Sequence, residues 1–277
     1  MRMEIKMAVE TVIRPNQRDL ALTEAYARRD LLYFLIWRDI KIRYKQTVLG
    51  VAWAVLVPVI QLVIFSVIFG RLAGIKPDGD YPYTLFVLAG LVPWTFFAQS
   101  VTQGGQSLVN QQHLFTKVYF PRLFVPTGTV GGCFVDLLIS FGVFAAVIAW
   151  YRFIPAWQVI FVPVLIAWTI LVSLGAVYLL SALSVAYRDF RYVIPFMIQS
   201  LMYLSPVVYS VEIVPEQYQW LLGVNPLAGI IDGFRSAILG KSWNLPLLLT
   251  SLCSTAVVLL AGVMYFRNTE RRFADIA

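Results

Sequence analysis

The sequence predicts an all-α polytopic membrane protein. Its 277 residues are 59% apolar and only 13% charged, with a mean hydropathy of +0.74, whereas about 25% of a soluble domain is charged. Six apolar runs, five of them uncharged and one with a single aspartate, each reach or approach the roughly 20 helical residues that cross a bilayer. The 22 lysines and arginines all lie outside these runs. Together these observations favour six membrane-spanning helices over a soluble fold.

The N-terminal segment, residues 1–48, is charged and precedes the first predicted span. Within it, the apolar run Leu31–Trp37 has seven residues, which rise only about 10 Å as a helix and cannot cross a membrane. Charged residues flank this run on both sides. We therefore expect an amphipathic helix over about residues 22–46 that lies flat at the membrane interface, with its basic side chains toward anionic headgroups. The simpler alternative is an anchoring helix with no further role.

Turn-forming or charged residues separate the predicted spans. Arg71–Pro82, which is rich in glycine, proline and aspartate, closes the first pair of spans. A polar stretch, residues 103–122, follows the second span, and Tyr187–Arg191 makes a short turn after the fourth. The predicted spans are residues 49–69, 83–101, 123–150, 157–186, 193–209 and 245–266. They form a membrane domain over residues 49–267, and residues 268–277 are a tail.

The segment between the fifth and sixth spans, Glu212–Asn244, is too apolar for an ordinary external loop. It contains Trp220 and the pair Asn225-Pro226. Two short re-entrant helices that dip into the outer leaflet, held by aromatic anchors, would explain this composition.

The basic residues predict the orientation in the membrane. Most lysines and arginines lie in residues 1–48, in the loops after the second and fourth spans, and in the tail. Because positive residues stay on the cytoplasmic side, both termini are expected in the cytoplasm. The formal net charge of +7 follows from this bias, so we expect no nucleic acid as a partner.

Few residues could carry chemistry. Asp136 is the one carboxylate well inside a predicted span; we interpret it as a paired structural group near a span end, with a proton relay as the alternative. His113 stands alone and both cysteines lie in apolar runs, so no metal site is predicted. Gly240-Lys241-Ser242 lacks the glycine that a phosphate-binding loop needs five positions earlier. The sequence therefore predicts neither catalysis nor a bound cofactor in this chain.

Five short motifs occur in order along the chain. They are Trp37–Gln46 with Leu49-Gly50 and Trp53; Gly90–Phe97; Lys117–Arg122; Ser205–Ser210; and Asn225-Pro226-Leu227 with Gly233-Phe234-Arg235. With these motifs, six predicted spans and an interfacial helix, the chain resembles the permease subunits of ABC-type polysaccharide exporters, the O-antigen, capsule and teichoic acid export family. The resemblance runs from about Leu31 to the C-terminus.

This resemblance implies a homodimer in the bacterial inner membrane with two copies of a separate cytoplasmic ATPase, which would bind the ATP and Mg²⁺. The implied cargo is a polysaccharide on an undecaprenyl diphosphate carrier, moved outward through a conduit at the dimer interface. Two alternatives are an exporter of a lipid or drug and a membrane-embedded glycan-modifying enzyme, for which only Asp136 offers a polar site. A proton-coupled flippase would need several intramembrane ionisable residues, and the predicted spans lack them.

The resemblance also assigns three groups of residues. The cytoplasmic gate, which would give charge-assisted hydrogen bonds to the diphosphate, comprises Arg38, Lys41, Arg43, Tyr44, Lys45, Leu49 and Gly50. The ATPase contacts, in a coupling helix over 111–122 and in the turn 187–191, comprise His113, Leu114, Phe115, Lys117, Tyr119, Phe120, Arg122, Arg188 and Asp189. The conduit, whose aromatic rings would face sugar rings, comprises Trp53, Trp94, Phe97, Tyr203 and Tyr209. Alternatively, the gate cations only hold lipid headgroups, and single aromatic residues only face lipid.

Overall fold

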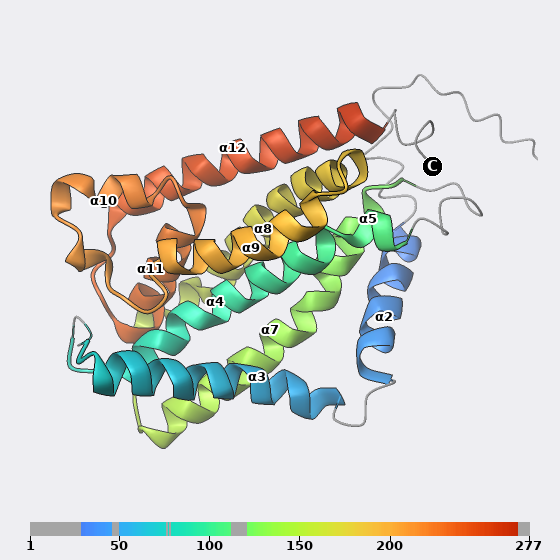
Figure 1. Cartoon of the computed structure of the whole chain (residues 1–277). Coiled ribbons are helices and arrows are strands. Elements are labelled where there is room, and N and C mark those ends of the chain that lie inside the picture. Colours follow the sequence, from blue (N-terminus) through green and yellow to red (C-terminus); the bar gives the residue numbers. More distant parts are fainter. Residues whose placement is uncertain (1–28, 46–49, 76, 78, 112–120, 271–277) are drawn as a thin grey trace, which may run out of the picture.

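The computed structural model describes residues 29–45, 50–75, 77, 79–111 and 121–270. The regular elements within these ranges are helices (Figure 1). In chain order they are α2 (Arg29–Lys45), α3 (Gly50–Phe65), the π-helix η1 (Ser66–Leu72), α4 (Tyr83–Gly104), α5 (Ser107–Asn110), α7 (Phe124–Trp150), the 3₁₀-helix η2 (Trp157–Phe161), α8 (Val162–Ala186), α9 (Phe190–Leu204), the 3₁₀-helix η3 (Val211–Ile213), α10 (Glu216–Leu222), α11 (Pro226–Leu239) and α12 (Leu245–Glu270).

Five helical segments within the described ranges are long and apolar enough to cross a membrane. They are Ala52–Leu72, Tyr83–Gly104, Phe124–Trp150, Trp157–Ala186 and Leu245–Glu270. Each coincides with one of the predicted spans, because a long uncharged run can satisfy its backbone polar groups in lipid only as a helix. The chain is therefore an all-α polytopic membrane protein, as predicted.

The fifth predicted span, residues 193–209, differs from the structure. Helix α9 has 15 residues, or about 22 Å at ~1.5 Å per residue, which is less than the ~30 Å of bilayer hydrocarbon. The helix ends at Leu204 because Ser205, which precedes Pro206, is extended with φ −95° and ψ 142°. By length and composition the described residues support five spans. A span over residues 193–209, which would bring the number to six, remains a prediction.

Helix α4 lies at the centre of the bundle. In its most apolar stretch 78% of residues are buried, against 11–33% for the other four long segments. It packs against α7, α8 and α11. The other long helices therefore present broad apolar faces outward, and the segment built from α3 and η1 is the least covered of them.

Glycines let two pairs of helices approach closely. Between α8 and α12, a Cβ added at Gly175 would lie 2.7 Å from the Cα of Leu259. Between α2 and α7, a Cβ at Gly128 would lie 3.1 Å from the Cβ of Leu35. Because small residues remove the side chains that would separate the two backbones, they set these helix–helix distances.

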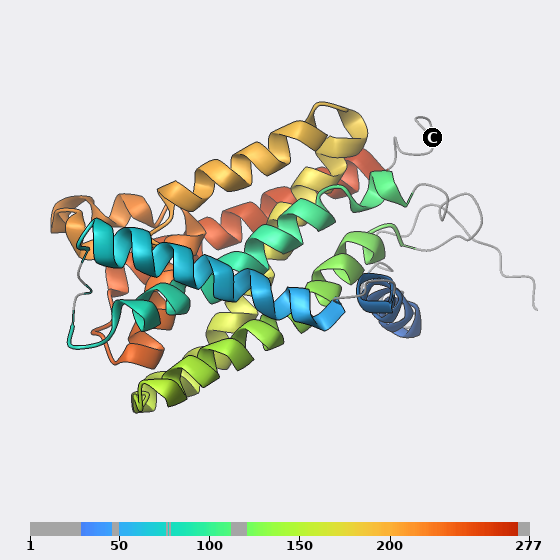
Figure 2. The same cartoon turned by 60° about the horizontal axis from the view of Figure 1, so that its bottom comes forward.

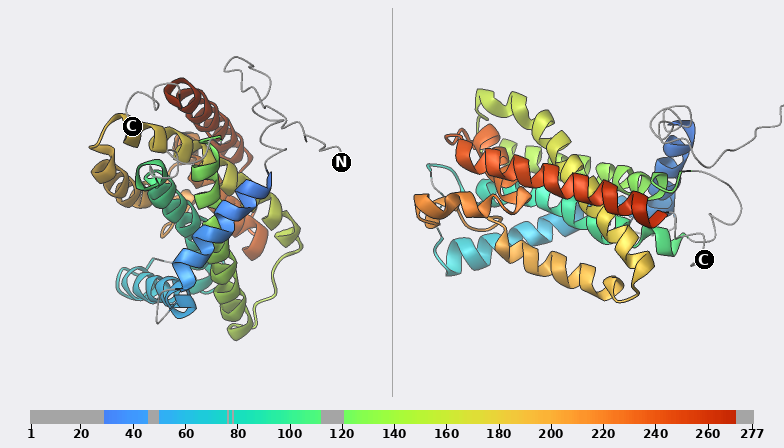
Figure 3. Two further views of the ribbon diagram at one scale, coloured as in Figure 1. Left: turned by 90° about the vertical axis from the view of Figure 1, so that its right-hand side faces the viewer. Right: turned by 90° about the horizontal axis from the view of Figure 1, so that it is seen from above.

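Helix α2 lies across one end of the bundle (Figure 3) and is seen almost end-on in Figure 2. Leu35 is buried, while Tyr33, Phe34 and Trp37 are more than half exposed. One face of α2 packs against α7, and the other offers aromatic side chains, as a helix at a membrane interface does. The start of α2 and the end of α12 lie at the same end of the molecule (Figure 1).

Two short helices occupy the predicted re-entrant segment. Helix α11 is buried at every residue from Leu227 to Leu239 and packs against α4, α8 and α12. The side-chain oxygen of Asn225 accepts a hydrogen bond from the backbone N–H of Leu227 and so caps its start. Gly240, with φ +78°, ends it in the left-handed conformation. This burial agrees with a helix that dips into the membrane domain.

Candidate functional site

The predicted gate residues in α2 differ in their exposure. Arg38, Arg43 and Tyr44 are half-buried, while Lys41 and Lys45 are exposed. Residues four positions apart share a helix face, which explains why the two lysines point the same way. Of the other two predicted gate residues, Gly50 begins α3 and Leu49 lies outside the described residues.

Asp136 of α7 holds two of these gate residues. Arg43 donates a hydrogen bond from Nη1 to Oδ2 of Asp136, and the hydroxyl of Tyr44 donates to Oδ1. The interpretation of Asp136 as a paired carboxylate is therefore confirmed, although it lies near the middle of α7 rather than near a span end. The pairing avoids the large cost of an uncompensated charge within a membrane domain.

The protonation of Tyr44 follows from this environment. Burial, and next the hydrogen bond to Asp136, raise the pKa of Tyr44 well above its ordinary value. The phenol therefore stays protonated at physiological pH and acts as a donor to the carboxylate. The Tyr44 hydroxyl thus has its hydrogen-bond acceptor within the protein, in the carboxylate of Asp136.

Arg43 also connects α2 to α4. Its Nη2 donates to Oε1 of Gln103 and lies 3.5 Å from Sγ of Cys133. Cys133 is buried, so a cysteine expected among apolar side chains in fact contacts a guanidinium. Arg43 thus holds α2, α4 and α7 together at one point.

Arg38, which precedes Arg43 by more than one turn of α2, also has partners within the protein. Its Nη2 lies 2.8 Å from Oδ1 of Asp39 and donates to Oε1 of Gln111 at 2.5 Å. The second carboxylate oxygen of Asp39 accepts a hydrogen bond from the hydroxyl of Thr129 in α7, at 3.3 Å. These contacts use Nε and Nη2 of the Arg38 guanidinium and hold its side chain against Asp39 and Gln111.

The predicted ATPase contacts are only partly within the described residues. His113, Leu114, Phe115, Lys117, Tyr119 and Phe120 lie outside them. Arg122 donates from Nη1 to the backbone carbonyl of Glu270 at 3.1 Å and so joins the segment before α7 to the end of α12. Arg188 and Asp189 are exposed between α8 and α9, where a partner subunit could reach them.

The five predicted conduit residues separate into exposed and buried ones. Trp53 is 58% exposed and Tyr203 is 66% exposed, whereas Trp94 and Phe97 are buried in the core of the single chain. Tyr209 is partly buried, and its hydroxyl donates to the carbonyl of Leu204 at 3.2 Å. Of these five residues, Trp53 and Tyr203 offer a broad ring face to a ligand.

Comparison with known proteins identifies the family. Residues 30–239 match the family described as ABC-2 type transporter. The chain belongs to this family. It is therefore a transport permease subunit and not an enzyme, which confirms the resemblance to ABC exporter permeases seen in its motifs.

Three relatives align with most of this permease. Over 248 residues it is 26% identical to the O-antigen export system permease protein RfbA of Klebsiella pneumoniae, covering 89% of this chain and 95% of that protein. RfbA of Myxococcus xanthus is 26% identical over 255 residues, 91% and 97% of the two chains. The polysialic acid transport protein KpsM of Escherichia coli is 25% identical over 242 residues, 85% and 92% of the two chains.

Arg235 has a role that its motif did not reveal. It is fully buried in α11 of the permease and donates to the backbone carbonyls of Phe86, Val207 and Tyr209 at 3.3, 2.7 and 3.1 Å. Its Cζ lies 3.6 Å from the centre of the Phe86 ring. A planar guanidinium with five donors suits this arrangement. Arg235 fastens the non-helical segment after α9 to the first turns of α4.

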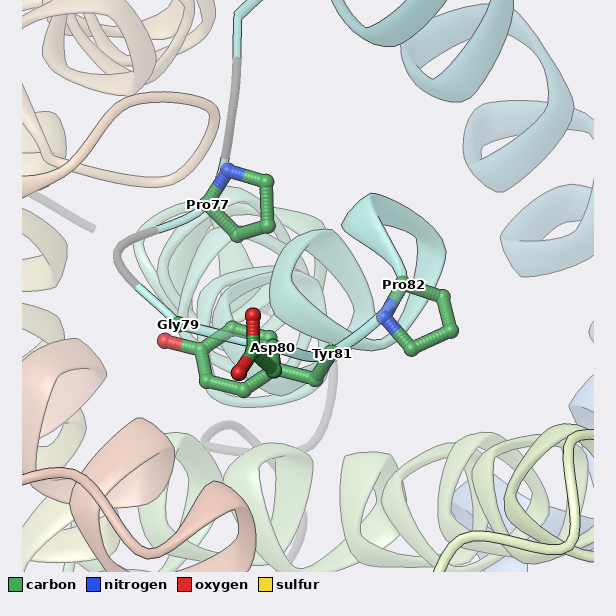
Figure 4. Close-up of a pocket in the computed structure, with 5 residues that line it drawn as sticks. All are labelled: Pro77, Gly79, Asp80, Tyr81 and Pro82. Atoms are coloured by element: carbon green, nitrogen blue, oxygen red, sulfur yellow. The ribbon is translucent and has the colours of Figure 1, made fainter.

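An open pocket of about 590 Å³ lies in the loop between η1 and α4 (Figure 4). Its lining residues all belong to this one loop: Pro77, Gly79, Asp80, Tyr81 and Pro82. In Figure 1 this loop is at the opposite end of the permease from α2. The pocket is therefore separate from the gate residues. Within the described residues, no group of three or more metal-ligating side chains could hold a metal ion.

Proposed function

We propose that this permease exports a polysaccharide on an undecaprenyl diphosphate carrier outward across the bacterial inner membrane. The observation that carries this proposal is the alignment with two O-antigen export permeases and a polysialic acid transport protein over most of both lengths. The cargoes in these names are all sugar polymers. A cargo of the same class is the simplest inference for this chain.

The working assembly in this proposal is a homodimer with two copies of a cytoplasmic ATP-binding subunit. In this proposal the ATP-binding subunit binds ATP and Mg²⁺ and supplies the energy for transport, in agreement with the assignment of this chain to the ABC-2 type transporter family. The α3 and η1 segment is the least covered of the long helices, which leaves a large apolar face for lipid or a second copy. Both termini and the turn 187–191 would then face the cytoplasm and the ATPase.

The exposed face of α2 supplies the cargo contact in this proposal. Lys41 and Lys45 are exposed beside Trp37, and ammonium groups give charge-assisted hydrogen bonds to phosphate oxygens. Arg38 and Arg43 instead hold α2 in place through their internal partners. The exposed rings of Trp53 and Tyr203 offer apolar faces for sugar rings, which bind weakly enough for a polymer to slide.

Depletion of the permease in its native cell tests this function. We expect surface polysaccharide to disappear and lipid-linked polymer to accumulate at the cytoplasmic face of the inner membrane, with recovery when the chain is restored. Unchanged surface polysaccharide would overturn the proposal. Accumulation of a lipid or a small hydrophobic compound in place of polymer would instead favour a lipid or drug exporter.

A further inference from the structure

Three glutamines, one in the last turn of α4 and two in the segment that follows it, form hydrogen bonds to α2 and α9. Gln103 accepts a hydrogen bond from Arg43, and Gln111 accepts one from Arg38. Gln106 donates from Nε2 to the backbone carbonyl of Arg191, at the start of α9, at 3.3 Å. We call Gln103, Gln106 and Gln111 the glutamine bridge, because they join α2 to the turn between α8 and α9.

The chemistry of the bridge differs from that of the Asp136 site. An amide oxygen accepts a hydrogen bond from a guanidinium but does not neutralise it. Breaking such a bond leaves no buried opposite charge behind, whereas separating Arg43 from Asp136 would. The bridge bonds can therefore exchange during a conformational cycle, while the Arg43–Asp136 pair acts as a fixed point.

The backbone of the bridge is firmly seated on α8 and α9. A Cβ at Gly104 would lie 2.7 Å from Cγ1 of Val177 in α8, and a Cβ at Gly105 would lie 2.8 Å from Cδ1 of Ile194 in α9. The side chain of Ser107 is buried and donates to the carbonyl of Gly104 at 2.6 Å. A displacement of the turn between α8 and α9 would thus carry the bridge with it.

We propose that the glutamine bridge transmits movement of the cytoplasmic turn 187–191 to α2 during the transport cycle. This inference rests on the proposed function, which places that turn against the ATPase. It assigns Arg38 and Arg43 as positioning residues for α2, while Lys41 and Lys45 contact the cargo.

The first test uses Gln111→Leu in the complete permease–ATPase complex, reconstituted in proteoliposomes with lipid-linked polymer. Leucine keeps the side-chain size and removes the acceptor for Arg38. We expect ATP hydrolysis within about twofold of the wild type and polymer export per ATP reduced about tenfold, since one hydrogen bond to a charged group changes an equilibrium by roughly that factor. Normal export per ATP would overturn the proposal.

A control variant removes a glutamine acceptor elsewhere in the permease. Gln219 in α10 accepts a hydrogen bond from Asn244 at 2.7 Å, and α10 lies at the end of the bundle opposite to α5 (Figure 1). Gln219→Leu should leave export per ATP unchanged. An equal loss in both variants would mean that any lost amide bond impairs the permease, which also overturns the proposal.

A double-variant cycle isolates the link itself. Arg38→Gln and Gln111→Leu remove the two ends of one bond, and Arg38→Gln also removes the contact with Asp39. The double variant should therefore export no less per ATP than the weaker of the two single variants. Losses that multiply would show that the two residues act separately and would contradict the bridge.

Movement of α2 can be followed by labelling Ile42→Cys with a maleimide in a Cys253→Ser background, because Ile42 is 62% exposed and Cys133 is buried. ATP should change the labelling rate in the wild-type background but not with Gln111→Leu. An ATP-dependent change that persists in the variant would overturn the bridge. If the wild-type complex itself fails to export polymer, the proposed function fails instead.

Discussion

At the scale of single residues, Asp136 decides where α2 lies. Its two carboxylate oxygens accept hydrogen bonds from Arg43 and Tyr44, 93 and 92 positions away in the sequence. The side chain of Asp136 is only 13% exposed, so the cation beside it matters energetically. The same residue ties the predicted gate to the third predicted span.

Replacing Asp136 with asparagine should destabilise the permease by about 2–3 kcal/mol, because Arg43 would keep a partly buried charge without its counterion. The measurement is the temperature at which half of the detergent-solubilised protein stops eluting as a folded species. Asp80→Asn, in an exposed loop, is the matched control and should leave this temperature unchanged. The double variant Arg43→Met/Asp136→Leu should recover much of the loss; no recovery would contradict the pairing as its cause.

Arg235→Met should be more destabilising, by roughly 3 kcal/mol or more, because three backbone carbonyls lose their buried donor. Arg235→Lys should not restore stability, since an ammonium cannot reproduce the planar fork of donors. The same thermal assay measures both, with the exposed Arg152→Met as control. If Arg235→Met had the same thermal midpoint as the wild type, the hydrogen bonds of Arg235 to these carbonyls would contribute little to stability.

The sequence indicated that Asp136 should be paired, but it did not identify the partners of Asp136 or of Arg235. A lone intramembrane carboxylate signals a buried cation, yet Arg38, Lys41, Arg43 and Lys45 were equally close candidates along α2. Only the helix phase against α7, set by Gly128 and Gly131, places Arg43 rather than the lysines at Asp136. Arg235 gave less warning, because its three acceptors are backbone carbonyls without any side-chain signature.

At the scale of elements, glycine contacts determine how α8 and α12 pack. Gly175→Ala should lower stability by about 1–3 kcal/mol, because its Cβ would meet the backbone of Leu259 and force the helices apart. Gly142→Ala in α7 is the matched control, since nothing lies within 4 Å of its Cβ position and alanine favours helix over glycine. Equal thermal midpoints for the two variants would contradict the close packing of α8 on α12.

The helix boundaries in the structure agree with those predicted from the sequence where apolar composition alone determines them. A long apolar run must become helix in lipid, so α4, α7, α8 and α12 begin and end within a few residues of their predicted bounds. Helix α9 stops at Leu204, although the apolar run continues. There, Pro206 and the hold of Arg235 on the carbonyls of Val207 and Tyr209 override the apolar composition.

At the scale of the whole molecule, the loop with Asp80 and the turn with Asp189 lie at opposite ends of the bundle (Figure 1). In cells, a Cys253→Ser permease with Asp80→Cys should react with a membrane-impermeant maleimide from outside the inner membrane. With Asp189→Cys it should react only after the cells are opened. Labelling of both variants from the same side would contradict the proposed topology.

The most direct test of the exporter function is affinity purification of the tagged permease from its native membrane, followed by mass spectrometry of the proteins and lipids that co-purify. We expect a stoichiometric ATP-binding subunit and a glycan attached to a polyprenyl diphosphate. Recovery of the permease without an ATP-binding subunit in several mild detergents would contradict the proposed exporter, because no other source of energy for transport would then be associated with it.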